Sequence, residues 1–302
     1  MANICNCSLS LSNTGTPSKQ SIAAVTKKLI FVKLYADDGT RNKIASTDTL
    51  DASYFDALVN NSDASKRWYP TPEIKNVTDD RADPSTETFT DNTIAITTDG
   101  ARSFLGLMLN MGSVFLSKLQ SIACNKVGVY YVDNCGKING TISSDGLSLY
   151  PVAISDGSFD ARLIKATDAA IAKVQISFNV SAIEKDSNLR LAEPESDVDL
   201  LALDGLLDVN AAISAPSTTG FVAALSLDYG AFGDPIKAKG WLLADFVLYN
   251  ETQAASVVIT STTESPDGTY TFITPAQTAA DVMTLTSAKD GFELVAATVT
   301  IP

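Results

Sequence analysis

The chain has 302 residues, a formal net charge of −13 and no histidine. Histidine is the usual general base at neutral pH and the commonest metal ligand, so its absence excludes Ser-His-Asp and Cys-His catalytic sites and histidine-based zinc or haem sites. The 35 acidic residues outnumber the 22 Lys and Arg, which disfavours a surface that grips a nucleic-acid backbone. We therefore expect a structural or binding protein with no cofactor and no metal, and not an enzyme.

The first predicted elements lie in a stretch of short apolar runs separated by Gly, Asp, Asn and Pro, a pattern typical of a β protein. Residues 29–35 predict a strand, which Asp37-Asp38-Gly39 turns toward a partner at Lys43-Ile44. Residues 51–58 predict a short helix. No secretory signal precedes these elements, because the N-terminus lacks a basic region followed by an apolar run.

The middle of the chain carries the strongest helix signal. Asp99 is a predicted N-cap, and apolar residues then recur at helical spacing as far as Ile122, with Gly112 as a point where the run divides. The stretch is too short and too interrupted to span a membrane, which takes roughly 20 apolar residues. Residues 127–132 and 137–142 follow as two strands of a predicted hairpin.

The clearest strand is 172–182, in which apolar and polar residues alternate without a break. The apolar set is Ala172, Val174, Ile176, Phe178, Val180 and Ala182. A period of two over this length predicts one face on a core and the other in water. Two interpretations stay open: a wall strand of a large sheet or of a barrel shared between subunits, or a long edge or hairpin strand of a sandwich.

A small, polar, Pro-bearing stretch at 211–220 predicts a linker, so we expect two domains, 1–212 and 213–302. Strand-like runs follow at 221–227, 241–249, 256–261, 269–273, 282–286 and 292–301. Their even spacing predicts an immunoglobulin-like β-sandwich. Asp267-Gly268-Thr269-Tyr270 resembles the tyrosine corner of such domains, with one residue missing.

Acidic residues gather before the predicted linker. The set is Glu193, Glu195, Asp197, Asp199, Asp204 and Asp208. They offer oxygen ligands for Ca²⁺, but without the spacing of a calcium-binding loop. A solvated face of a third helix at 197–207 is the favoured interpretation. Four cysteines, Cys5, Cys7, Cys124 and Cys135, are expected to be scattered reduced thiols.

The most unusual local string is Trp68-Tyr69-Pro70-Thr71-Pro72, in which the prolines forbid helix. Its aromatic side chains suit either docking into a neighbouring subunit or attachment of the loop to its own core. An extended arm at 73–89 follows, and Asp83-Pro84 poorly suits a central strand. The interface hypothesis names Trp68, Tyr69, Pro70, Pro72, Glu73 and Phe89.

The stretch 67–104, RWYPTPEIKNVTDDRADPSTETFTDNTIAITTDGARSF, resembles virion proteins of tailed bacteriophages of Bacteroidetes-type hosts. The order of the predicted elements is similar to that of the tail-tube fold of such phages. Strands come first, and one helix, the strand-turn-strand GVYYVDNCGKINGT and a long alternating strand follow. The resemblance covers about residues 25–210. It implies a tail-tube-like sheet or barrel domain with one packed helix, and an oligomeric ring whose subunits pool strands into one barrel. A C-terminal immunoglobulin-like appendage is frequent among phage proteins.

The expected function is therefore a virion component, a sixfold or twelvefold homo-oligomer in a tail tube, ring or neck. Its partners would be further copies of itself and neighbouring tail or capsid proteins, without a membrane. DNA would pass as non-specific cargo, because an acidic wall repels phosphates. Lys173 on the polar face of strand 172–182 departs from such a wall. The alternatives are an auxiliary capsid protein and a surface adhesin or carbohydrate-binding module, which would show an exposed aromatic platform built on Trp68 or Trp241.

Overall fold

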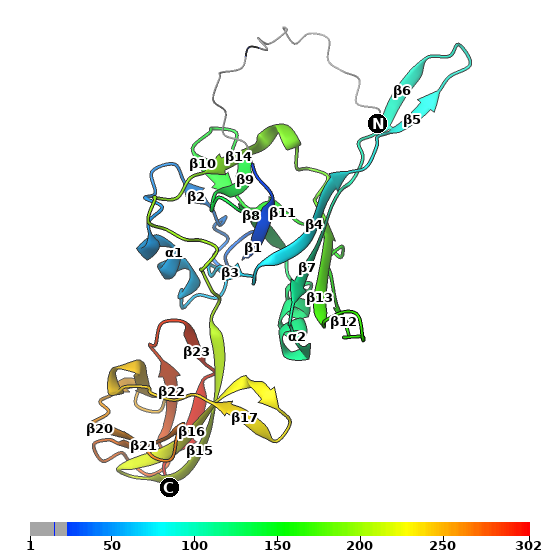
Figure 1. Ribbon diagram of the computed structural model, residues 1–302. Coiled ribbons are helices and arrows are strands. Elements are labelled where there is room, and N and C mark those ends of the chain that lie inside the picture. The colour runs from blue at the N-terminus through cyan, green and yellow to red at the C-terminus, as the bar shows by residue number, and fades with distance from the viewer. Residues whose placement is uncertain (1–14, 16–22) are drawn as a thin grey trace. The chain divides into compact units, whose positions relative to one another are not determined.

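The computed structural model describes residue 15 and residues 23–302 (Figure 1). The chain is mainly β, as predicted. It divides into two compact units, Met1–Asp204 and Gly205–Pro302, and each has its own hydrophobic core. The division falls ahead of the predicted boundary at residue 212. Cys5 and Cys7 lie outside the described residues, while Cys124 and Cys135 are exposed free thiols.

The first unit contains an eight-stranded sheet with the order β2-β10-β9-β8-β1-β3, to which β11 and β14 attach at β8 and β9. Its strands are β1 (Thr26–Lys33), β2 (Ile44–Ala45), β3 (Tyr69–Pro70), β8 (Val127–Asp133), β9 (Ile138–Ile142), β10 (Ser148–Tyr150), β11 (Val152–Ala153) and β14 (Leu189–Ala192). The predicted hairpin at 127–142 is confirmed as β8 and β9.

A second, four-stranded sheet of the same unit has the order β12-β13-β7-β4. Its strands are β4 (Ile74–Arg81), β7 (Arg102–Leu109), β12 (Asp160–Ile164) and β13 (Lys173–Asn179). Between β4 and β7 the chain forms a separate two-stranded hairpin of β5 (Ser85–Thr88) and β6 (Ile94–Thr98). The helices are α1 (Ala52–Val59), α2 (Ser113–Ile122) and the 3₁₀ turn η1 (Asp186–Asn188).

The core of the first unit lies between the two sheets. Phe31 and Val129 of the larger sheet meet Phe104, Ile176 and Phe178 of the smaller one, all nearly inaccessible to water. The predicted core residues Val174, Ile176, Phe178 and Val180 are buried, which confirms the core face of this strand. The opposite face is not wholly in water as predicted, because Gln175 is buried as well. The strand is central in its sheet, between β12 and β7, and ends at residue 179.

The helix predicted from Asp99 to Ile122 is wrong in its first half. Residues 102–109 form β7, in which Phe104, Gly106 and Met108 lie on the core face while Leu105 and Leu107 face away. Helix α2 begins only after Gly112, which is its N-cap. The helix predicted at 51–58 is confirmed as α1, and the Asp51 carboxylate caps it by accepting a hydrogen bond of 2.8 Å from the Tyr54 N–H.

Two further local predictions are wrong. Lys43-Ile44 does not return to β1: the turn at 37–39 closes only a single bridge between Tyr35 and Arg41, and β2 pairs with β10. The segment 197–207 is a series of turns, not an acidic helix. Those turns are held by the buried Lys28, whose ammonium donates to the Leu201 carbonyl at 2.7 Å.

The second unit consists of two sheets, with orders β20-β21-β16-β15-β23 and β19-β18-β22-β24, and β17 attached to β16. Its elements are β15 (Leu207–Ser217), β16 (Gly220–Ala231), β17 (Asp234–Lys237), η2 (Leu243–Asp245), β18 (Phe246–Asn250), β19 (Ala255–Val257), β20 (Ser261–Glu264), β21 (Thr269–Ile273), β22 (Val282–Ser287), β23 (Phe292–Leu294) and β24 (Ala297–Thr300). Both sheets contribute to one core, for example Phe221 and Phe272 from one and Phe246 and Leu285 from the other.

The predicted linker at 211–220 is wrong, because these residues form most of β15 and its turn into β16. The tyrosine corner differs as well. The Tyr270 hydroxyl donates to the Ala238 carbonyl at 3.0 Å and accepts from the Trp241 N–H at 3.1 Å, both about thirty residues upstream. In immunoglobulin-like domains the corresponding bond reaches only a few residues back. An immunoglobulin-like topology therefore stays a prediction.

Candidate functional site

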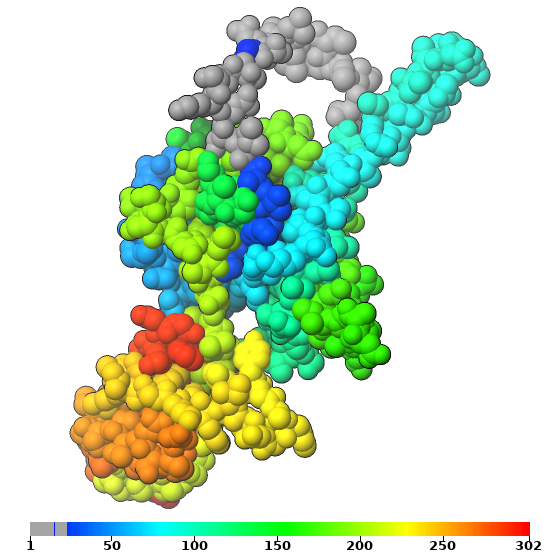
Figure 2. All heavy atoms as spheres, in the orientation of Figure 1, coloured from blue at the N-terminus to red at the C-terminus, as the bar shows by residue number. Residues whose placement is uncertain are grey.

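The most exposed structured part of the first unit is the hairpin of β5 and β6. It projects from the end of the four-stranded sheet (Figure 1) and stands out in the space-filling view (Figure 2). All four residues of β5 are exposed, and Ile94 and Ile96 of β6 are 68% and 57% exposed. An isolated two-stranded hairpin is marginally stable in water, so a ribbon with exposed isoleucines is expected to gain from a partner surface.

The register of the hairpin sets what each of its faces presents. Thr86 lies opposite Ile96, and Thr88 lies opposite Ile94. Because directly opposite residues share a face, these four side chains form one face of methyl and methylene groups. Glu87, which follows Thr86, points to the other face. The hairpin therefore has one largely apolar face although its sequence is polar.

The tip of the hairpin is a tight turn. The Asn92 N–H donates to the Phe89 carbonyl at 2.9 Å, and Asn92 has a φ of 65°, a conformation that Asn tolerates better than most residues. The Asp91 carboxylate accepts hydrogen bonds from the Thr93 hydroxyl and N–H at 2.6 and 3.0 Å. These two bonds hold the pKa of Asp91 below its usual value, so the tip is anionic at neutral pH.

Two arginines and two aspartates fix the base of the hairpin. Arg102 donates from Nε and Nη2 to the two carboxylate oxygens of Asp79, both at 2.7 Å. Arg81 makes a similar paired contact with Asp186 at 2.7 and 3.0 Å, and Arg102 Nη1 reaches Asp186 at 3.3 Å. Bidentate guanidinium–carboxylate pairs restrict orientation as well as distance. This network, called the base clamp below, holds the strands from which the hairpin leaves the sheet.

Charge and backbone both favour this arrangement. The hydrogen bond that Arg81 donates lowers the pKa of Asp186, and the hydrogen bonds that Arg102 donates to Asp79 raise the pKa of Arg102. Arg81 Nη1 also donates to the Gly100 carbonyl at 2.7 Å. At Gly100 the strands approach so closely that an added Cβ would lie 1.6 Å from the Ala82 carbonyl oxygen. Only glycine fits there, so the hairpin leaves the sheet along one defined path.

The residues of the interface hypothesis are not gathered in one place. Trp68 is 2% exposed, with its ring 5.0 Å from Tyr130 and 5.9 Å from Phe55. It covers the face of β1 and β8 that points away from the core described above, so it is not part of the exposed surface. The alternative interpretation, a loop attached to its own core, is the one that agrees with this burial.

The other members of the hypothesis lie along the chain between Trp68 and the hairpin. Tyr69 is partly exposed and its hydroxyl donates to the Ala64 carbonyl at 2.9 Å, while Pro70 pairs with β1 and Pro72 is half-buried. Glu73 is exposed and forms ion pairs with Lys27 and Lys75. Phe89 is 48% exposed at the hairpin tip. The predicted arm 73–89 is thus divided: its first part is β4, paired with β7, and only the part after Arg81 projects.

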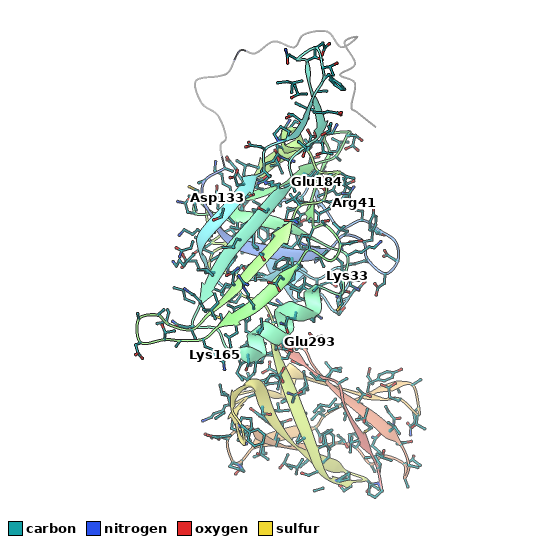
Figure 3. The ribbon with its side chains drawn as sticks, turned by 90° about the vertical axis from the view of Figure 1, so that its right-hand side faces the viewer. Lys33, Arg41, Asp133, Lys165, Glu184 and Glu293 are labelled. Atoms are coloured by element: carbon teal, nitrogen blue, oxygen red, sulfur yellow. The ribbon has the colours of Figure 1, made fainter. Side chains whose placement is uncertain are left out.

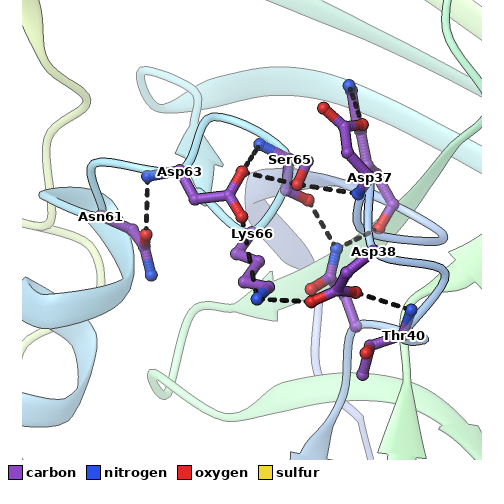
Figure 4. Close-up of polar contacts among 9 residues, drawn as sticks. Asp37, Asp38, Thr40, Asn61, Asp63, Ser65 and Lys66 are labelled. Carbon is purple, nitrogen blue, oxygen red and sulfur yellow. Dashed lines mark hydrogen bonds and ion pairs between the residues drawn. The ribbon is translucent and has the colours of Figure 1, made fainter.

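The loop before Trp68 is held by a polar network between residues 37–40 and 61–66 (Figure 4). Lys66 Nζ lies 2.7 Å from Asp38, and the Asp63 carboxylate accepts from the Ser65 hydroxyl at 2.6 Å. The hydrogen bond from Lys66 keeps the pKa of Asp38 well below its usual value. Each carboxylate of this network already has a protein donor, so the arrangement stabilises a loop and supplies no reactive group.

The acidic segment 193–208 does not converge on one point. Glu193 pairs with Lys137 at 2.5 Å, and Asp199 accepts from the Leu201 N–H at 3.0 Å. Among residue 15 and residues 23–302, no three Cys, Asp or Glu side chains are grouped in a way that suits a metal ion. Within the same residues, no helix is both long and apolar enough to cross a membrane.

The base clamp was not predicted from the sequence. Two of its members, Arg102 and Asp186, lie far along the chain, and no local pattern connects them. No protein-family model, curated protein or solved structure matches the chain significantly.

Proposed function

We propose that this chain is a non-enzymatic structural protein of a tailed-bacteriophage virion. In this proposal it assembles into a homo-oligomeric tail tube, ring or neck through which DNA passes. The observation that carries the proposal is the exposed hairpin on its rigid base: a ribbon that buries nothing of its own unit, yet leaves the sheet along a fixed path. Such a preorganised projection loses little conformational freedom on binding, which suits contact with another subunit.

The composition supports the same proposal. A chain without histidine lacks the commonest general base at neutral pH, and its net charge of −13 repels DNA phosphates. In the first unit, α2 is followed by the hairpin of β8 and β9 and then by the central alternating strand β13, which is the order on which the tail-tube resemblance rests. The adhesin alternative loses its expected feature, since Trp68 and Trp241 are 2% and 5% exposed and form no surface platform.

The test is the native mass of the purified full-length chain, measured by native mass spectrometry and light scattering over a range of concentrations. Electron microscopy of the same sample would then show the symmetry. A sixfold or twelvefold ring, or a stack of such rings, supports the proposal. A protein that remains monomeric at the highest concentration reached, and at both low and physiological salt, refutes it.

A further inference from the structure

The four-stranded sheet has a second face that the core does not use. Leu107 on β7 lies opposite Gln175 on β13 and Lys75 on β4, and Gln175 lies opposite Arg162 on β12. Their neighbours along each strand point into the core, so these side chains point away from it. We call this surface the open face.

The open face combines a leucine stripe with cations at one end. Leu105, Leu107 and Leu109 follow one another along β7, and each is only half-buried. Lys173 lies opposite Leu109, and Lys165 follows β12 at the end of the sheet far from the hairpin (Figure 3). We call Lys75, Arg162, Lys165 and Lys173 the basic end. Arg162, Lys165 and Lys173 form no ion pair within the part of the chain that the structure describes.

The hairpin has the opposite charge. Residues 82–101 contain four carboxylates, at Asp83, Glu87, Asp91 and Asp99, and neither Lys nor Arg. The base clamp places this acidic ribbon beyond one end of the four-stranded sheet, while Lys165 of the basic end lies at the other (Figure 3). The first unit is therefore acidic at one end of its sheet and basic at the other, within a chain that is strongly acidic overall.

We propose that the hairpin of one copy of this chain docks on the basic end of the open face of a second copy. This inference rests on the proposed function, because it names the surfaces through which the subunits would assemble. The Ile94–Ile96 face would cover the leucine stripe, and the carboxylates at the tip and edges of the hairpin would lie near Arg162, Lys165 and Lys173; Lys75 is already paired with Glu73. Charges are screened beyond about 8 Å at physiological salt, so the local match outweighs the repulsion between two acidic chains once the surfaces touch.

The contact would be head-to-tail, because the two surfaces differ and lie at opposite ends of the sheet. A head-to-tail contact generates a ring if the rotation closes and a filament if it does not. It also gives Lys173 a role. A cationic, leucine-bearing face poorly suits a wall along which DNA slides, whereas it suits a protein ribbon with carboxylates and isoleucines.

The experiment uses three double variants of the full-length chain, each checked for unchanged thermal unfolding. The face variant is Arg162→Glu with Lys165→Glu, two exposed residues of the basic end. The matched control is Lys185→Glu with Lys237→Glu, which changes the net charge equally at exposed positions outside it. The hairpin variant is Ile94→Ser with Ile96→Ser. Native mass and light scattering give the concentration at which each protein is half-assembled.

We expect the face and hairpin variants to need at least about tenfold more protein for half-assembly than wild type, and the control to match wild type. An equimolar mixture of the face and hairpin variants should give a 1:1 heterodimer, because only one intact hairpin and one intact face remain to meet. If the face variant assembles at the same concentration as wild type, this inference is refuted and the proposed function is not. If the wild type itself is monomeric, the proposed function is refuted. If the wild type binds short duplex DNA tightly and the face variant does not, the basic end is a DNA-binding surface and the docking proposal is refuted.

Discussion

Replacing Phe178 with Ala tests whether β13 is the central support of the first unit. Phe178 is 2% exposed, its ring stacks on Phe104 at 5.0 Å and Phe159 at 6.3 Å, and Phe31 lies edge-on at 6.4 Å. The substitution removes the buried ring and leaves a cavity between two sheets that cannot easily approach each other. We expect a loss of about 3–5 kcal/mol in the free energy of unfolding. Each lost ring pair accounts for about 0.5–1.5 kcal/mol within that range.

The assay is urea unfolding followed by tryptophan fluorescence. Trp68 lies in the first unit and Trp241 in the second, so a Trp241→Phe background leaves Trp68 as the only tryptophan and a reporter of the first unit. Each protein is measured at several concentrations, because a partner subunit would add to the apparent stability. Phe178→Leu should fall between wild type and Ala, since it keeps most of the volume but not the ring contacts.

The matched control is Ser177→Ala on the same strand. Ser177 is half-exposed on the opposite face of β13, so its replacement should change the free energy of unfolding by no more than about 0.5 kcal/mol. Equal losses from Ser177→Ala and Phe178→Ala would refute the assignment of the two faces. An unchanged Trp68 transition in Phe178→Ala would show that the aromatic cluster contributes little to this unit.

Three further predictions concern the hairpin and the second unit. Gly100→Ala should weaken amide protection in the hairpin and its base in hydrogen exchange, whereas Gly112→Ala, where nothing lies within 4 Å, should not. Because Arg81 lowers the pKa of Asp186 from its ordinary 3.8, the stability that this carboxylate contributes is present above that pH and is lost as the pH falls through the lowered value. Protection at the base should therefore persist from pH 7 to about 5 and fall below about 4, and Asp186→Asn should abolish this transition. A fragment 205–302 should unfold cooperatively, but a fragment 215–302 should not. The shorter fragment lacks most of β15, which pairs with both β16 and β23. Equal behaviour of the two fragments would contradict this prediction.

The sequence predicted an element correctly where its apolar residues fit only one repeat, either that of a strand or that of a helix. In 172–182 every second residue is apolar, and no helix would place these side chains on one face. In 102–109 the apolar residues are more numerous, and Leu105, Met108 and Leu109 suit a helix as well as a strand. The strand forms because Met108 and Phe104 complete a core with β13, a contact that a single segment does not reveal.

Local composition also led to two wrong interpretations, the linker at 211–220 and the surface anchor at Trp68. The small residues at 211–220 resemble a linker, yet Ala211 and Ile213 are half-buried against the core of the second unit. Trp68 resembles a surface anchor, yet β1 and β8 are covered on both faces, and Trp68 is part of the second cover. Both outcomes depend on whether a strand that is distant in the sequence has a second apolar face to be covered. A short stretch of sequence does not contain that information.

The base clamp shows why the hairpin could be only partly predicted. The register places Arg81 directly opposite Arg102, and like charges at directly opposite positions destabilise a strand pair. The pair is tolerated because Asp79 binds Arg102 and Asp186 contacts both guanidinium groups. Asp186 is the first residue of η1, 84 residues after Arg102. The same two arginines that would separate β4 and β7 therefore hold them in one orientation once the chain has folded. A hairpin held in this way has lost its freedom before it meets a partner, so less of the contact energy is spent on ordering it.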